Sequence, residues 1–407
     1  MRIAVLRDTR PGERRVALVP ESVAKLGEKD ISVAVEEGAG ASAGFPDEKY
    51  REEGAEVHGN LPDLLADARA VLKVNPPTLG KDGERDEVGA LPEGAVFLGF
   101  LNPLEELGTV QALGRQGVSA LALELLPRVT RAQKMDALSS QATAGGYRAA
   151  LLGASELGRF LPMLMTAAGT VPPAKVLVLG AGVAGLQAIA TCRRLGATVT
   201  GFDIRPAVKE QVESLGATFL ESDLEADAET EGGYARALSE DEQKKNLDLI
   251  AGEIRQTDLV ITTAQVPGRR APVLVTQEMV RSMRAGSVVV DMAASTGGNC
   301  QLSEPDQVVE HHGVRIAGPT NLPSELPTHA SQMYGRNVSA LLLHLLSDGD
   351  LRVDLEDEIV SGCCVSHGGR VVHPKVLEAL GEAGPEEKAP GGDTDTDQTG
   401  EKEESHG

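Results

Sequence analysis

A glycine-rich turn at residues 180–185 constrains this chain more than any other feature of its sequence. Residues 176–203 read VLVLGAGVAGLQAIATCRRLGATVTGFD, so the turn follows one apolar run and precedes a stretch with helical spacing. A second apolar run closes at Asp203, 23 positions after Gly180. A strand, a tight turn, a helix and a second strand account for this order, which predicts a βαβ unit within a parallel sheet.

The three glycines of this turn also have the spacing of a dinucleotide-binding loop. Gly180 permits a sharp turn, Gly182 lets the backbone approach a pyrophosphate, and Gly185 allows the helix to pack closely on the strand. The N–H groups at the start of the helix would face the phosphates. Asp203 would accept hydrogen bonds from the adenosine ribose and repel a 2′-phosphate, which favours NAD(H) over NADP(H). Arg205 keeps the NADP(H) alternative open, because a nearby arginine commonly accommodates that phosphate.

Short apolar runs alternate with helical patterns along most of the 407 residues. They form two similar series, over 3–125 and 176–318, which predict an α/β protein with two Rossmann-like, doubly wound parallel-sheet domains separated by a cleft. Helices expected at 138–166 and 325–347 would cross between the two domains.

The first domain is therefore expected to be discontinuous, with residues 1–140 joined by 325–378. The NAD-binding domain would occupy 141–324, between these two segments. Within the returning segment, residues 357–374 predict a short strand pair turned at two adjacent glycines. Residues 379–407 hold nine acidic residues, two lysines and few apolar side chains, which predicts a disordered acidic tail.

Charge and cysteine usage exclude several classes of function. The net charge of −22 at pH 7 repels nucleic acid and anionic lipid, so we expect no nucleic-acid partner. No window of about 18 residues is free of charge, and we therefore expect no direct membrane insertion. No signal peptide is visible, because no apolar stretch of about 7 to 15 residues follows the first charges. Cys192, Cys300, Cys363 and Cys364 lack metal-ligand spacing, so the sequence predicts reduced thiols and no metal site.

A polar cluster, PRVTRAQKMDALSSQ at residues 127–141, precedes the glycine-rich turn. Thr130 and Gln133 fit a capping box, so one interpretation is that they close the N-terminus of a helix. Such a helix would place Gln133 and Asp136 on one face, with Ser139 at its edge. Spacing alone leaves two interpretations open, a solvated face and a face that contacts a ligand.

Seven separated motifs occur in one order along the chain. They are RRVALVPESVAKL, PRVTRAQKMDALSSQATAGGYRA, GAGVAG with FDIRP, EGGYA, ITTAQVPGRRAPVLVT, DMAASTGGNCQLSEP and TNLPS. Over roughly residues 1–378 the chain thereby resembles the alpha subunit of proton-translocating NAD(P) transhydrogenase, in its soluble NAD(H)-binding domain. That family lies within the alanine dehydrogenase/transhydrogenase superfamily.

The resemblance implies an enzyme that transfers hydride directly between NADH and NADP⁺ bound on a partner, coupled to proton translocation by a membrane component. It implies a homodimer, with NAD(H) as its own cofactor and NADP(H) on the partner. The expected location is cytoplasmic, peripheral at the cytoplasmic face of the inner or plasma membrane, against membrane-spanning and NADP(H)-binding components. Direct hydride transfer needs no general acid or base, only two rings held in reactive geometry.

The resemblance also implies roles for the polar cluster. Arg128 and Asp136, with Ser139, would hold and orient the nicotinamide carboxamide. Gln133 would reach the NADP(H) presented by the partner. These four residues form the expected catalytic set.

A polar insertion at residues 221–246 carries a further implied role. By the resemblance, Gly233 and Tyr234 belong to a mobile loop that folds over bound nucleotide and excludes water. The alternative from the residues alone is a surface helix introduced by Gly232 and Gly233. Gln265 stands where the resemblance leads us to expect an apolar residue. The implied cofactor-binding set is Arg128, Val129, Thr130, Gly180, Gly182, Val183, Gly185, Asp203, Ile204, Arg205, Gly233, Tyr234 and Gln265.

Two other functions are weighed against this one. Alanine dehydrogenase shares the architecture, and Arg15 and Lys73 match the basic residues that bind its substrate. An amino-acid dehydrogenase must also move a proton, yet Asn102 and Ser295 stand where that family's histidine and aspartate should be. A non-catalytic NAD-sensing protein is the third possibility, and the complete polar cluster argues against it.

Overall fold

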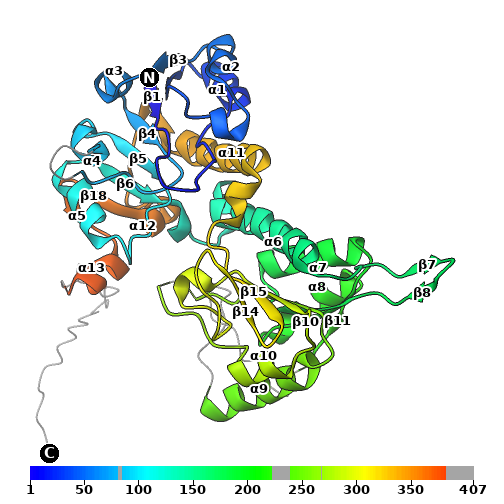
Figure 1. The fold of residues 1–407 in the computed structure, drawn as a ribbon. Coiled ribbons are helices and arrows are strands. Elements are labelled where there is room, and N and C mark those ends of the chain that lie inside the picture. The colour runs from blue at the N-terminus through cyan, green and yellow to red at the C-terminus, as the bar shows by residue number, and fades with distance from the viewer. Residues whose placement is uncertain (81–84, 222–238, 267, 382–407) are drawn as a thin grey trace, which may run out of the picture.

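The computed structural model describes residues 1–80, 85–221, 239–266 and 268–381. Two α/β units lie next to one another, each built on its own sheet (Figure 1). We call the unit with the eight-stranded sheet the first domain and the unit with the seven-stranded sheet the second domain. Both sheets are dominated by parallel strands, so the fold class predicted from the sequence is confirmed.

The sheet of the first domain combines strands from both ends of the chain. Its strands are β1 (Arg2–Val5), β2 (Ser32–Glu36), β3 (Glu56–His58), β4 (Ala70–Leu72), β5 (Val96–Gly99), β6 (Ser119–Ala122), β18 (Cys364–His367) and β19 (Arg370–Val371). The spatial order is β19-β18-β6-β5-β4-β1-β2-β3. Strands β1 to β6 are parallel, and β18 and β19 extend one edge in antiparallel fashion.

The sheet of the second domain repeats this topology. Its strands are β9 (Lys175–Leu179), β10 (Thr198–Phe202), β11 (Thr218–Phe219), β12 (Leu259–Thr262), β13 (Val288–Asp291), β14 (Val308–His311) and β15 (Val314–Ala317). They are arranged in the order β11-β10-β9-β12-β13-β15-β14, with β14 alone antiparallel. In both sheets the chain therefore winds outward in two directions from a first central strand.

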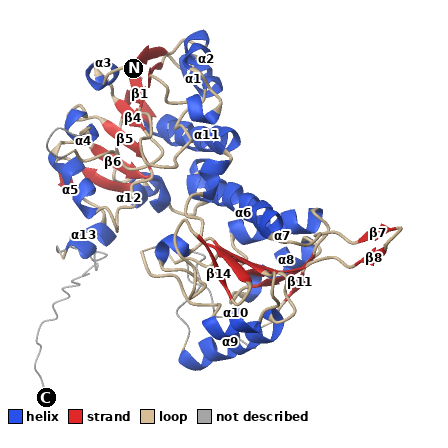
Figure 2. Ribbon diagram, viewed as in Figure 1, coloured by secondary structure: helices blue, strands red, loops and turns tan. Residues whose placement is uncertain are grey.

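Helices cover both faces of each sheet (Figure 2). Those of the first domain are α1 (Pro20–Gly27), α2 (Asp47–Glu52), α3 (Leu61–Leu65), α4 (Glu87–Ala90), α5 (Leu107–Arg115), α11 (Pro327–Leu345), α12 (Glu358–Cys363) and α13 (Pro374–Leu380). Those of the second domain are α6 (Ala137–Glu156), α7 (Val183–Arg194), α8 (Lys209–Ser214), α9 (Glu240–Ile254) and α10 (Gln277–Ser282).

Alternation of side chains along the buried strands explains why each sheet has two apolar layers. In β1, Ile3 and Val5 point into one cluster, whereas Ala4 and Leu6 point into the other. The first of these clusters also contains Tyr334 of α11, so a helix that follows the second domain in sequence completes the core of the first. The β9 strand divides its side chains between two clusters in the same way.

Two sequence expectations need correction. The helix expected at 138–166 ends at Glu156, and the chain then forms a hairpin of β7 (Leu164–Thr166) and β8 (Gly169–Val171) that projects from the second domain (Figure 1). Pro162 prevents a helix from continuing to residue 166, because proline cannot donate a helical hydrogen bond and disfavours helix in the residue before it. The backbone is already extended at Leu157, with ψ 122°.

The strand pair expected at 357–374 is shorter than predicted. Only β18 and β19 pair, and Gly368 and Gly369 turn them with φ values of 57° and 83°. The residues before them form α12, because Asp357 Oδ1 accepts hydrogen bonds from Ile359 N and Val360 N and so caps a helix. The helix expected at 325–347 is present as α11.

Candidate functional site

The glycine-rich turn lies at the carboxyl end of β9, where the strand order of the second sheet changes direction. Ligands of open α/β sheets bind in the crevice at such a point. Gly180 has φ 95°, a backbone conformation that glycine adopts without strain. A Cβ on Gly185 would lie 1.8 Å from the carbonyl oxygen of Gly180, so only glycine fits. Gly182 precedes α7, whose first residue Val183 is 40% exposed.

Asp203 follows β10, the strand next to the turn, and is buried. Its Oδ2 accepts a hydrogen bond from Ala181 N at 2.7 Å. Arg205 makes three further contacts of 2.9 Å: its N and Nε donate to Oδ1, and its Nη2 donates to Oδ2. A carboxylate offers about four lone-pair sites, and four hydrogen bonds are present. A ribose hydroxyl would therefore have to replace Arg205 at this carboxylate.

The loop after β12 closes the opposite side of the crevice. The buried Asn299 side chain holds this loop, because it accepts from Ala264 N at 3.0 Å and donates to Ala264 O at 2.8 Å and Pro272 O at 2.7 Å. Gln265 is exposed, and its Nε2 donates to Met292 O at 2.9 Å. The Gln265 side chain thus ties the loop after β12 to the residue that follows β13 (Val288–Asp291), a contact that an apolar side chain could not make.

The polar cluster folds as two helices that meet at Asp136. Residues Thr130–Met135 form the 3-10 helix η3, and α6 begins directly after Asp136. Val129 precedes η3, and no side chain caps that helix. The capping box considered for Thr130 and Gln133 is therefore not formed, because Thr130 already lies within the helix.

Asp136 caps α6 in place of the expected pair. Its Oδ1 accepts from Ser139 N at 2.8 Å and its Oδ2 from Ser139 Oγ at 2.5 Å. Both residues are half-buried, whereas Arg128 and Gln133 are exposed. The structure thus brings Asp136 and Ser139 into direct contact at a helix N-terminus and leaves the longer side chains of the cluster accessible.

Helix α6 connects the polar cluster with the glycine-rich turn. A Cβ on Gly146 would lie 2.0 Å from Ala184 O, so the first turn of α7 rests directly on the backbone of α6. Ser139 lies seven residues before Gly146, which is about 10 Å along the helix axis. The contact of Asp136 with Ser139 at the start of α6 and the glycine-rich turn at the start of α7 therefore belong to two helices that pack directly on one another. Gly233 and Tyr234 lie outside the described residues.

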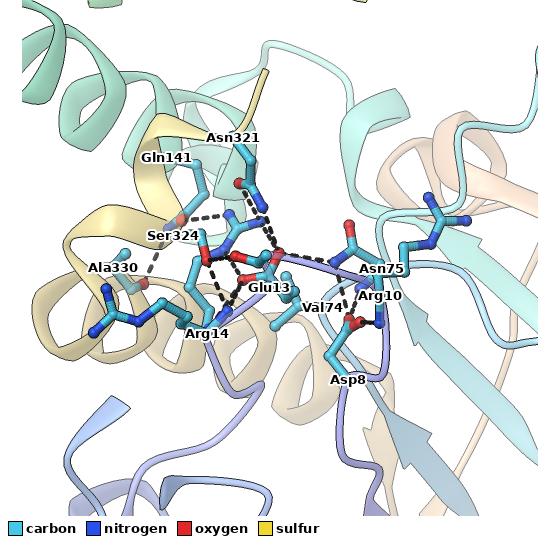
Figure 3. Close-up of polar contacts among 12 residues, drawn as sticks. Asp8, Arg10, Glu13, Arg14, Val74, Asn75, Gln141, Asn321, Ser324 and Ala330 are labelled. Carbon is cyan, nitrogen blue, oxygen red and sulfur yellow. Dashed lines mark hydrogen bonds and ion pairs between the residues drawn. The ribbon is translucent and has the colours of Figure 1, made fainter. Parts of the chain in front are cut away.

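A buried polar network joins the two domains (Figure 3). The Glu13 carboxylate accepts hydrogen bonds from Arg15 Nε at 2.8 Å, from Arg15 Nη2 at 2.6 Å and from Asn75 Nδ2 at 2.9 Å. Arg15 Nη1 donates to Gln141 of α6 at 2.9 Å, while Asn321 Nδ2 donates to Glu13 at 3.1 Å. Burial raises the pKa of Glu13, but the hydrogen bonds and charge of Arg15 outweigh it and lower the pKa to about 2. The ion pair is thus intact at neutral pH.

The two basic residues that match the substrate-binding residues of alanine dehydrogenase form ion pairs within this chain. Arg15 is held by Glu13, and Lys73 is fully buried with its Nζ 2.6 Å from Glu87 Oε2. A substrate carboxylate would have to displace one of these acidic partners. Asn102 follows β5 with φ 44°, and Ser295 lies in the 3-10 helix η5 (Ala294–Thr296).

A cavity of about 230 Å³ opens between the two domains. Leu104 and Glu105 line it from the first domain, and Gly268, Arg270 and Thr296 from the second. A larger cavity of about 540 Å³ belongs to the first domain alone, beyond β4 and β5, and does not adjoin the glycine-rich turn. The smaller cavity therefore marks the cleft expected between the domains.

The four cysteines are buried, and burial raises the pKa of each thiol, to about 12 for Cys192 and about 11 for Cys300. Among the described residues, no group of three or more His, Cys, Asp or Glu side chains is arranged to hold a metal ion. In the same part of the chain, no helix combines the length and apolarity that crossing a bilayer requires.

Sequence reasoning missed several residues that shape this region. Glu13 lies only two positions before Arg15, and that spacing was the available signal. Gln141 and Asn321 lie 126 and 306 positions from their partner Arg15, so no local pattern indicates the contact. Glu124, three positions before Pro127, belongs to no motif and was also missed.

The two wound sheets and the glycine-rich turn define a two-domain α/β protein with a dinucleotide-binding loop. Family models described as alanine dehydrogenase/PNT match residues 4–144 (N-terminal domain) and 149–374 (C-terminal domain). An NAD(P) transhydrogenase subunit alpha protein of Rhodospirillum rubrum is 49% identical over 378 residues, 92% of this chain and 98% of that protein. The crystal structure of transhydrogenase from Sinorhizobium meliloti matches with TM-score 0.80 at 42% identity, over 92% of this chain and 100% of that one.

The chain belongs to the alanine dehydrogenase/PNT family, as its motifs predicted. A structure of L-alanine dehydrogenase also matches, with TM-score 0.78 at 28% identity, over 94% of this chain and 99% of that one. Sequence identity is therefore higher to the transhydrogenase subunits than to the alanine dehydrogenase. The resemblance to transhydrogenase alpha subunits is confirmed.

Proposed function

We propose that the chain is the NAD(H)-binding subunit of an NAD(P) transhydrogenase of the proton-translocating type. It is an oxidoreductase that transfers hydride directly between NADH and NADP⁺ bound on a partner. The observation that carries the proposal is the contact of Gly146 with Ala184, because it joins the glycine-rich turn to the polar cluster through one pair of helices. The transhydrogenase names of relatives at 49% and 42% identity support it.

The second domain offers suitable groups for NAD(H). The N-terminus of α7, with Gly182 and Val183, presents unpaired N–H groups to a pyrophosphate. Asp203 accepts hydrogen bonds from the adenosine ribose once Arg205 moves away from the Asp203 carboxylate. The negative charge of Asp203 disfavours a 2′-phosphate. Ile204 and Gln265 flank this crevice in the loops after β10 and β12.

The chemistry requires orientation of two rings more than proton transfer. Nicotinamide supplies and accepts the hydride. Arg128, with the paired Asp136 and Ser139, holds the carboxamide group, and the exposed Gln133 extends toward the nucleotide of the partner. Fixed geometry of this kind lowers a barrier by converting an encounter into a nearly unimolecular step.

The assembly proposed for the chain is a homodimer that docks on membrane-spanning and NADP(H)-binding components at the cytoplasmic face of the membrane. Two relatives are named as alpha subunits, which supports partner chains. The β7–β8 hairpin supports self-association, because Met165 and Met163 are 80% and 58% exposed on it or beside it. The domain limits proposed are 1–140 plus 325–378, and 141–324.

Alanine dehydrogenase remains a second candidate because a relative of that name, from Bacillus subtilis, is 29% identical over 96% of this chain. The ion pairs of Arg15 with Glu13 and of Lys73 with Glu87 argue against this function, because both basic groups are already occupied. Asn102 and Ser295 also carry no side chain that could transfer a proton near neutral pH. A non-catalytic NAD-binding role is disfavoured by the same polar cluster that supports hydride transfer.

Two measurements test the proposal. Titration of the purified protein with NADH and NADPH should give clearly tighter binding of NADH. After addition of the separately purified NADP(H)-binding component, NADH should reduce an NADP⁺ analogue without added alanine or pyruvate. Binding of NADH without transfer would favour the sensor, and alanine-dependent reduction of NAD⁺ would favour the dehydrogenase.

A further inference from the structure

Asn337 lies on α11, and its side chain contacts the polar cluster. Its Nδ2 donates to Lys134 O at 2.9 Å, and Lys134 is the neighbour of Gln133 in η3. Its Oδ1 accepts from Ser140 Oγ at 2.7 Å, and Ser140 belongs to the first turn of α6. One amide thus bridges the two helices that meet at Asp136.

The bridge is the end of a longer series of hydrogen bonds. Arg15 donates to Gln141 at 2.9 Å, and Gln141 Nε2 donates to Ser140 Oγ at 3.3 Å and to Ala330 O at 3.0 Å. Ser140 then donates to Asn337. The network that joins the domains therefore continues, through side chains on α6 and α11, to the backbone beside Gln133.

Besides Asn337, the segment is held by two buried apolar side chains and by Arg131, whose Nη2 lies 3.7 Å from Asp357 Oδ2. Ala132 and Met135 of η3 are buried in the core of the first domain, at 2% and 7% exposure. Thr130, Gln133 and Lys134 are exposed, and no side chain caps η3. The Asn337 amide suits this place because its NH₂ group donates to Lys134 O while its separate oxygen accepts from Ser140 Oγ.

We propose that Asn337 is a positioning residue for hydride transfer, because it fixes the backbone from which Gln133 extends. The inference rests on the proposed function. Asn337 itself touches neither reacting ring and acts through Lys134 and Ser140. A displacement of about 1 Å between reacting groups can slow a reaction about 100-fold, so the loss of one anchoring bond reaches the chemistry without altering the nucleotide crevice.

The test compares three variants with the wild type. Asn337→Asp keeps Oδ1 but turns a second oxygen toward Lys134 O, and Asn337→Ala removes both bonds. Thr328→Val is the matched control, because Thr328 Oγ1 donates to Ala43 O at 2.8 Å from the far end of the same helix. Each variant is assayed for single-turnover hydride transfer with the NADP(H)-binding component, for NADH affinity, and for amide hydrogen exchange of residues 130–136.

Both Asn337 variants should slow transfer by at least about tenfold, change the NADH dissociation constant by less than about twofold, and speed exchange in 130–136. Thr328→Val should leave all three unchanged within about twofold. Equal loss of NADH binding and transfer, or unchanged exchange in Asn337→Ala, would overturn the inference. A wild type that transfers no hydride refutes the proposed function instead, and the exchange measurement still decides whether Asn337 holds the segment.

Discussion

The carboxyl group of Glu124 is buried beside the polar cluster with only one of its oxygens in use. Oε1 accepts from Leu101 N at 2.8 Å and from Asn102 N at 2.5 Å, whereas Oε2 is buried and has no hydrogen-bond partner among the described residues. Burial raises the pKa of this carboxyl to about 7, although the backbone N–H groups of Glu124, Leu101 and Asn102 act in the opposite direction. Glu124 therefore changes charge close to neutral pH.

The raised pKa of Glu124 predicts a loss of stability with rising pH. The folded state keeps a proton that the unfolded state, with its ordinary pKa of 4.5, has lost. The contribution is fully present below pH 4.5 and is lost as the pH rises through about 7, which amounts to about 2 kcal/mol between pH 5 and pH 8. Glu124→Gln has no carboxyl to titrate and should lack this pH dependence. In urea unfolding, the free energy of unfolding of the variant minus that of the wild type should therefore be larger at pH 8 than at pH 5 by that amount. An equal difference at both pH values would contradict the assignment.

Whether a residue of the site could be predicted depends on how far apart in the sequence its contact partners lie. The glycines and Asp203 could be predicted from sequence, because a strand, a turn and a helix bring them together over 23 positions. The ion pair of Arg205 with Asp203 was open to prediction for the same reason. Asn337 and Lys134 lie 203 positions apart, and their contact depends on packing that no local pattern encodes.

Among the elements, α6 packs very tightly against α7. It meets α7 so closely that Gly146 has no room for a side chain against Ala184 O. The central strands were predictable because apolar runs between turns are clear signals. The edge strands β3, β11 and β14 have no such run and were missed. The end of α6 was predicted wrongly, since the apolar residues after Glu156 continue a helical pattern whereas the chain is already extended at Leu157. Pro162 then prevents a helix from reaching residue 166.

Substitution Gly146→Ala should therefore disturb both stability and nucleotide binding. The added Cβ would lie 2.0 Å from Ala184 O, so α7 must shift. We expect destabilisation of about 1 to 3 kcal/mol from overpacking and at least about tenfold weaker NADH binding, because the start of α7 is the site proposed for the phosphates. Gly252→Ala in α9 is the control: nothing lies within 4 Å of its Cβ, and helix propensity predicts a gain of about 0.5 to 1 kcal/mol. Thermal unfolding and NADH titration distinguish the two, and unchanged NADH affinity in Gly146→Ala would refute the coupling.

At the scale of the whole molecule, the sequence predicts two wound sheets but not how they are joined. The joint depends on Glu13, whose carboxylate contacts Arg15 and Asn75 of the first domain and Asn321 after the second sheet. Breaking a buried ion pair leaves a charge without compensation. The spacing of the domains, and hence the cleft between them, therefore depends on long-range contacts that no local sequence motif predicts.

The projecting β7–β8 hairpin predicts how copies of the chain associate. Met165 in β7 is 80% exposed, and Phe160, four residues before β7, is 58% exposed; neighbouring exposed apolar side chains usually mark an interface. Phe160→Glu and Met165→Glu, combined, should convert a dimer into a monomer, because each charge would be buried without a partner. Val308→Glu on the edge strand β14 is the matched control, since Val308 is 54% exposed in the same domain but outside the hairpin. Sedimentation equilibrium gives the masses: a wild type that is monomeric, or a hairpin variant that remains dimeric, would exclude the hairpin as the interface.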